Sequence, residues 1–193
     1  MNSTVPTTRF ASVLGCARLW ALVALICLLA CGAQQNGSDS KQSRSKEKSS
    51  GQPIEMTLSQ LDGEQFDLKS LRGRFVIVSY FGSWHERGLD ELRRLNGMAK
   101  SGDASADLAV VAIALDVKPR HSIPKLMTAI EPSFPILLAD KEALHGRTPF
   151  GELPGVPTSY LLDRQGLVTD TLFGAIPQDY IRRRIRELSK DDP

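Results

Sequence analysis

Residues 74–84 read Arg74-Phe-Val-Ile-Val-Ser-Tyr-Phe-Gly-Ser-Trp84, a run that is mostly apolar until it ends at Gly82 and Ser83. A second run, Leu108 to Leu115, is also rich in Val, Ile and Leu without polar alternation. Runs of this kind are typical of parallel strands that are covered on both faces. We therefore expect these two segments to be strands at the centre of a sheet.

The segments on either side complete an α/β pattern. Glu86 to Lys100 places Leu89, Leu92 and Leu95 at three-residue spacing among charges, which predicts a crossover helix with one buried stripe. The other expected elements are an N-terminal β-hairpin (55–58 and 65–68, around Asp62-Gly63), a helix (123–130), a strand (134–138), a hairpin (159–163 and 167–173) and a final helix (178–188). Together they predict a central mixed β-sheet flanked by helices.

Three blocks resemble the thioredoxin superfamily, and within it the TlpA/ResA-like (redoxin) branch of envelope-facing bacterial thiol-disulfide oxidoreductases. The blocks are Leu61 to Gly73, Arg74 to Trp84, and Gly155-Val-Pro-Thr-Ser-Tyr-Leu-Leu-Asp163. The resemblance covers roughly residues 53–190. It implies a thioredoxin-like fold in which Pro157 is a cis-proline.

The redox centre that the resemblance implies is absent from this sequence. Relatives carry a Trp-Cys-x-x-Cys motif, whereas this chain reads Trp84-His-Glu-Arg-Gly88, and its only cysteines are Cys16, Cys27 and Cys31. Thiol–disulfide exchange needs a thiolate that attacks a disulfide sulfur. We therefore expect no catalytic residue in the domain, and no cofactor.

The turn after the first strand has features of its own. Ser83 followed three residues later by Glu86 fits a capping box, which would place Trp84 and His85 in the first helical turn. His85 is then either a partly exposed polar residue that fills an inherited turn, or a binding residue. A metal site is not expected, because His121 and His145 are not at ligand spacing from His85.

A peptide-binding groove could be retained although both cysteines of the motif are absent. The resemblance implies that the residue before the cis-proline, here Val156, offers its backbone to a bound peptide, as in strand addition. Pro157 could instead be a purely structural turn, and Trp84 could pack against the domain rather than serve as a recognition anchor. The candidate groove consists of Trp84, His85, Glu86, Gly88, Val156, Pro157 and Thr158.

The N-terminal region predicts export and a lipid anchor. The apolar run Leu19 to Ala30 is shorter than the roughly 20 residues of a spanning helix, and it follows Arg9 and Arg18. It closes on Leu-Leu-Ala-Cys31, which resembles a bacterial lipobox. An uncleaved signal-anchor helix is the alternative.

These features divide the chain into three expected parts: a lipoprotein signal peptide (1–30), a lipidated Cys31 with a disordered polar tether (31–52), and a thioredoxin-like domain (53–193). The membrane is thus one expected partner, through the lipid on Cys31, at the periplasmic side of the bacterial envelope. Gly32 rather than Asp after the cysteine favours the outer membrane, by analogy with enterobacterial sorting.

Two main functions from different classes remain, and binding of a small ligand or a metal at the turn with His85 is a third possibility. The first is a non-catalytic adaptor or assembly protein that binds a protein or peptide partner in the former active-site groove. The alternative is a thiol-disulfide oxidoreductase or redoxin-type antioxidant protein, which would need a thiol from outside the domain. The net charge of +2 gives no reason to expect nucleic acid, and Arg182-Arg-Arg184 with Arg186 is expected to form a solvated helix face, the alternative being contact with anionic headgroups.

Overall fold

A five-stranded mixed sheet of order β5-β4-β3-β8-β9 forms the centre of the computed structural model, which describes residues 51–100 and 107–191. The first three strands in this order are mutually parallel, whereas β8 and β9 are each antiparallel to the preceding neighbour. The strands are β3 (Phe75–Phe81), β4 (Leu108–Ala114), β5 (Ile136–Leu138), β8 (Thr158–Leu162) and β9 (Val168–Phe173). This architecture confirms the expected fold class.

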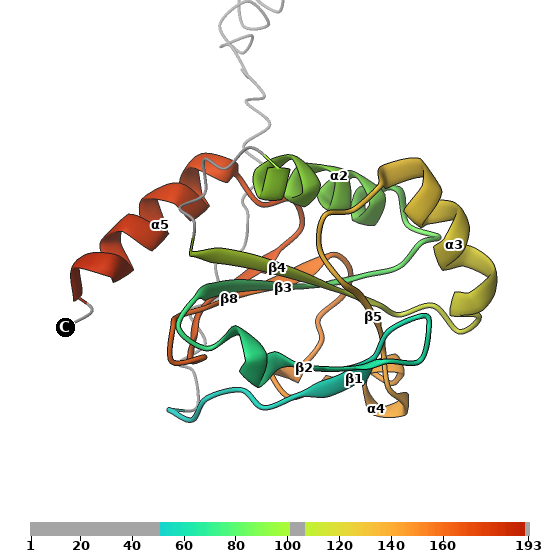
Figure 1. Ribbon diagram of the computed structural model, residues 1–193, viewed down its shortest axis with the longest axis horizontal. Helices are drawn as coiled ribbons and strands as arrows, with labels where there is room; N and C mark the ends of the chain where they lie inside the picture. Colours follow the sequence, from blue (N-terminus) through green and yellow to red (C-terminus); the bar gives the residue numbers. More distant parts are fainter. Residues whose placement is uncertain (1–50, 101–106, 192–193) are drawn as a thin grey trace, which may run out of the picture. The chain divides into compact units, whose positions relative to one another are not determined.

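The helices and the hairpin cover opposite faces of this sheet. Figure 1 shows α2 (Glu86–Lys100), α3 (Pro119–Ile130) and α5 (Gln178–Asp191) on one face. The expected N-terminal hairpin, β1 (Thr57–Ser59) with β2 (Gln65–Asp67), lies on the other face. Both faces of the sheet are therefore covered, as the unbroken apolar runs predicted.

Alternate residues of β3 supply the two halves of the core. Phe75, Ile77 and Phe81 pack in the cluster with α2, α3 and α5. Val78 and Tyr80 belong to the cluster on the hairpin side. This division follows from the period of two along a strand.

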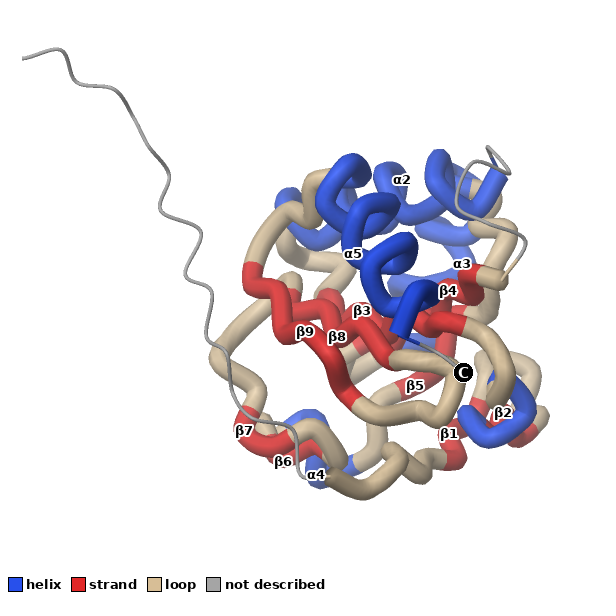
Figure 2. Tube along the Cα trace, turned by 90° about the vertical axis from the view of Figure 1, so that its left-hand side faces the viewer, coloured by secondary structure: helices blue, strands red, loops and turns tan. Residues whose placement is uncertain are grey.

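Several short elements were not expected from the sequence. They are a 3₁₀ turn η1 (Leu68–Leu71), the helix α4 (Lys141–Leu144), and a small hairpin of β6 (Arg147–Thr148) with β7 (Gly151–Glu152), which lies beside α4 in Figure 2. Between these two strands Phe150 stacks on Tyr160, with ring centroids 4.1 Å apart. The loop thus anchors an aromatic residue under the sheet.

Two charged residues are placed differently from the sequence expectation. Glu91, one of the charged residues that surround the predicted leucine stripe of its helix, is buried. Arg184 is half-buried and donates from Nε to Asp170 Oδ2 at 2.9 Å, so the arginine run of α5 is not wholly a solvated face. In both cases a neighbouring element covers the side chain, which helical periodicity alone does not report.

The signal peptide, the lipidated Cys31 and the tether predicted from the sequence lie outside the described residues. Within residues 51–100 and 107–191, no helix has the length and apolar character that crossing a membrane requires.

Candidate functional site

The turn after β3 is held by a buried aspartate that follows β4. Asp116 Oδ2 accepts from the Ser83 N–H at 3.1 Å, and Oδ1 accepts from the Ser83 hydroxyl. The Ser122 hydroxyl of α3 donates to the same Oδ1 at 2.5 Å. The predicted capping box is therefore wrong: Ser83 binds Asp116, which lies 33 residues away in sequence, in place of Glu86.

Helix α2 begins at Glu86, so Trp84 and His85 precede the helix rather than forming its first turn. The His85 carbonyl accepts the first helical N–H groups, from Gly88 at 2.9 Å and from Leu89 at 3.2 Å. His85 therefore occupies the N-cap position. Because Ser83 is occupied by Asp116, the helix starts two residues later than the capping box predicted.

Trp84 is a surface aromatic residue. Its side chain is 62% exposed. One part of the indole lies over Gly82, where an added Cβ would come within 2.5 Å of a ring atom. Gly82 therefore leaves room for the ring in this position. The exposed part of the ring is accessible to a binding partner, as the side chain of a recognition anchor must be.

The other residues of the turn differ in exposure. His85 is half-buried, and its Nδ1 is inaccessible without a hydrogen-bond partner among the described residues. Glu86 is exposed, whereas Gly88 is buried. A Cβ at Gly88 would lie 3.2 Å from the Gly82 carbonyl oxygen, so the helix start packs directly on the backbone that leaves β3.

The peptide bond between Val156 and Pro157 is cis, as predicted. Pro157 is buried and its carbonyl accepts from the Gly174 N–H at 2.8 Å; the buried Thr158 donates from Oγ1 to the Gly155 carbonyl at 2.7 Å. Val156 is half-buried, and neither its N–H nor its C=O has a partner within residues 51–100 and 107–191. The loop therefore offers one free backbone donor and one free acceptor.

The sheet register brings these two loops to the same edge. Tyr80 of β3 is paired with Thr158 of β8, so the chain leaving β3 and the chain entering β8 meet at that end of the sheet. Phe173, paired with Thr158 on the next strand, is 43% exposed and lies over Gly155. Sequence reasoning missed Phe173, because strand alternation does not identify which strand end stays uncovered.

Glu91 lies behind the turn on α2. Its side chain is inaccessible, one carboxylate oxygen accepts from the Ile176 N–H at 3.1 Å, and the other has no partner among the described residues. Burial raises the pKa of Glu91 to about 7, although the Ile176 N–H and Arg94, whose Nε lies 3.6 Å away, favour the charged form. This half-satisfied acid was not identified from the sequence.

The described residues do not gather a metal site. No group of three or more His, Cys, Asp or Glu side chains within them could hold a metal ion. His145 follows α4, and its Nδ1 lies 2.6 Å from the Lys141 carbonyl oxygen. His121 lies on α3.

Known proteins share both the sequence pattern and the fold. The chain is 22% identical over 130 residues to a thiol-disulfide oxidoreductase ResA of Bacillus cereus, covering 67% of this chain and 72% of that protein. It is 23% identical over 136 residues to thioredoxin-like protein YneN of Bacillus subtilis, with 69% and 76% covered. No family model matches the chain.

A solved structure gives the same fold independently. A thiol:disulfide interchange protein of the thioredoxin family from Chlorobium tepidum superposes with a TM-score of 0.60 at 21% identity, covering 78% of this chain and 98% of that one. By its fold the chain is thioredoxin-like, and its sequence is similar to these oxidoreductases of the TlpA/ResA-like redoxin branch.

Proposed function

We propose that this protein is a non-catalytic binding protein that holds an extended peptide segment of a protein partner at the former active-site edge. The observation that carries the proposal is the unpaired N–H and C=O of Val156 beside the cis bond to Pro157. An extended peptide satisfies such groups by pairing as an added strand. This interaction needs no thiol.

Two exposed aromatic residues give the edge its contact area. Trp84 lies at the end of β3 and Phe173 at the end of β9, on either side of the loop that contains Val156. Aromatic side chains supply much of the binding energy in protein interfaces. We infer that apolar side chains of the bound segment contact these two rings while its backbone pairs with Val156.

A photo-crosslinking experiment in the organism's own envelope tests this proposal. A benzoylphenylalanine at position 156 of the full chain should give a discrete protein adduct, whereas the same group at the exposed Glu64, in the turn of the distant hairpin, should not. Trp84→Ala should reduce the adduct at position 156 at least fivefold. Equal adducts from both positions, or an adduct insensitive to Trp84, would refute the groove.

Gly82→Ala provides a second variant, which retains the Trp84 side chain but changes its position. The new methyl group would overlap the Trp84 ring and displace it, while the neighbouring backbone keeps its hydrogen bonds. We expect this variant to lose the adduct as Trp84→Ala does. Retention of the adduct would show that the position of the ring is not important.

We propose further that the protein is anchored in the bacterial envelope by a lipid on Cys31, on the periplasmic side and in the outer membrane. The support is the apolar run that closes on Leu-Leu-Ala-Cys31 and the following Gly32. Cells fed an alkyne-labelled fatty acid should label the wild-type protein and not Cys31→Ser. Labelling of both proteins would contradict a lipid on Cys31. Recovery of the protein with inner-membrane fractions would contradict the outer-membrane location.

The name of the ResA relatives favours a second function, thiol-disulfide oxidoreduction; redoxin-type antioxidant activity is the other form that the family resemblance implies. Here it requires a thiol from outside residues 53–193, because those residues include no cysteine. Reduction of insulin disulfides by the purified chain separates the two functions, since only the second predicts activity above that of the added thiol alone.

A further inference from the structure

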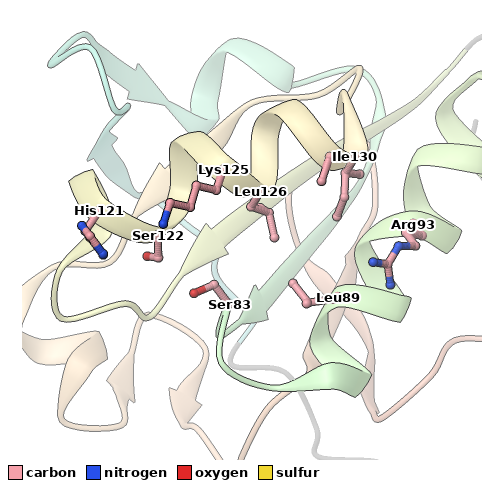
Figure 3. A pocket seen from close by; sticks show the side chains of 9 residues that line it. Ser83, Leu89, Arg93, His121, Ser122, Lys125, Leu126 and Ile130 are labelled. Carbon is pink, nitrogen blue, oxygen red and sulfur yellow. The ribbon is translucent and has the colours of Figure 1, made fainter.

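A second site, a pocket, lies between α2 and α3. Its cavity volume is about 380 Å³, within the range of roughly 300–1,000 Å³ typical of small-molecule sites. Figure 3 shows Leu89 and Arg93 projecting from α2, Ser83 from the turn, and five labelled side chains from α3: His121, Ser122, Lys125, Leu126 and Ile130. Neither the proposed groove nor the relatives' named activity accounts for it.

The wall of the pocket is apolar along its middle. Leu89 from α2 faces Leu126 and Ile130 of α3 across the cavity, which Ala129 also lines. Such a wall favours a ligand with a hydrophobic body, because water is released when apolar surfaces meet. The backbone N–H and C=O groups here belong to helices, so the pocket offers side-chain contacts and no free strand edge for an extended peptide.

One end of the pocket carries a positive charge. Lys125 lies on the same helix face as His121 and Ser122, at spacings of four and three residues. Helix α3 includes no acidic residue, and Lys125 has no ion-pair partner among the described residues. Arg93, in contrast, donates to Asp90 at 2.9 Å. Lys125 is therefore the cation best placed for a ligand carboxylate.

The two serine hydroxyls at this end add a second requirement. Ser83 and Ser122 both donate their protons to Asp116 beneath the pocket, so towards the cavity their oxygens can only accept. A simple carboxylate beside them would meet lone pairs. A ligand that also carries a hydroxyl or N–H next to its carboxylate satisfies both the lysine and the serines.

We infer that this pocket binds a small hydrophobic carboxylate that bears a hydrogen-bond donor beside the carboxylate, such as a 2-hydroxy acid with an aromatic or aliphatic body. Lys125 pairs with the carboxylate, Ser122 accepts from the adjacent donor, and the body lies between Leu89 and Leu126. The pocket ends at Ser83, next to Trp84, so an occupant contacts the same turn that borders the proposed peptide groove.

The test uses the full chain in nanodiscs of uncharged lipid and 3-phenyllactate as ligand, followed by saturation-transfer NMR with empty discs subtracted. Saturable binding is expected. Loss of the donor in 3-phenylpropanoate should weaken binding about fivefold, as for one neutral hydrogen bond. The absence of saturation, or equal affinity for the two acids, would overturn the assignment.

Three variants locate the site. Lys125→Gln should weaken 3-phenyllactate at least tenfold, and Ala129→Trp, which fills the apolar wall from an exposed helix position, should abolish binding. Arg120→Gln removes a charge from the same helix outside the pocket and should change affinity less than twofold. Thermal unfolding of each variant establishes that it is folded. Unchanged binding in both folded pocket variants would place the ligand elsewhere and refute the inference.

Discussion

Glu91 is the residue whose behaviour depends most on the fold around it. An exposed glutamate is ionised at neutral pH, but burial here raises the pKa to about 7. The folded chain thus keeps a proton that the unfolded chain releases near pH 4.5. Such a difference in proton binding links stability to pH.

Because the folded state binds the extra proton, the contribution of Glu91 to stability should be fully present below about pH 4.5 and should be lost as pH rises through 7. The shift corresponds to about 3 kcal/mol of unfolding free energy lost across that window. Glu91→Gln keeps an acceptor for the Ile176 N–H and cannot ionise, so the variant should lack this decline. Urea unfolding of Lys41–Pro193 at pH 5 and pH 8, with and without Glu91→Gln, measures the pH dependence of the unfolding free energy in the two proteins. Identical pH dependence in the two proteins would contradict the assignment.

Helix α2 offers two glycines in contrasting surroundings. Gly97 is exposed, and an added Cβ would meet only Gln178 Nε2, at 4.0 Å. Gly88 is buried, where a Cβ would lie 3.2 Å from the Gly82 carbonyl oxygen. The first site has room for a methyl group and the second does not.

Gly97→Ala should therefore raise the unfolding free energy by about 0.5–1 kcal/mol, the usual helix-propensity gain. Gly88→Ala gains the same propensity but must displace backbone, so it should be less stable than Gly97→Ala by at least about 1 kcal/mol. Urea titration of the two variants side by side gives the comparison. Equal gains in unfolding free energy would mean that the backbone at the start of α2 shifts at little energetic cost.

The strands β3 and β8 share one buried polar pair. Ser79 and Ser159 are opposite each other, fully buried, and joined by a hydroxyl hydrogen bond of 2.8 Å. Ser159→Ala should cost about 1–3 kcal/mol, because it leaves the Ser79 hydroxyl unpaired. The double variant Ser79→Ala/Ser159→Ala should recover most of that loss. If the double variant lost as much unfolding free energy as the two single variants together, the two hydroxyls would not be coupled.

The molecule as a whole combines a thioredoxin-like fold with a sequence that has no cysteine in residues 53–193. We expect the wild-type chain to reduce insulin disulfides no faster than the dithiothreitol blank, because no mixed disulfide can form on residues 53–193. The rate of insulin precipitation measures this. Activity clearly above the blank would favour the oxidoreductase function over the binding function.

His85→Cys/Gly88→Cys is the matched control for this assay. It places two thiols at the positions that the resemblance implies, in front of the cis bond to Pro157. We expect it to show activity above the blank, at reduced stability because of the tight contact at position 88. An inactive but folded double variant would mean that the edge has changed beyond the loss of its cysteines.

Much of the architecture was predictable because it follows from local patterns. The bounds of α2, the central strands and both expected hairpins reflect periodicity and turn residues that adjacent positions carry. The cis bond at Pro157 came with the family resemblance. The capping box predicted at Ser83 was wrong, because Asp116, which follows β4, binds Ser83 in place of the local partner Glu86.

The order of residues was enough to establish an α/β domain with a thioredoxin-like succession of elements and no cysteine, since both properties belong to the chain as written. The folded chain was needed to learn that Asp116 ties the turn to α3, that Glu91 is buried, and that the Trp84, Val156 and Phe173 loops share one edge. Most of these features join residues far apart in the sequence, as Ser83 and Asp116 are at 33 positions. Their energies come from burial and pairing across elements, which no local pattern encodes.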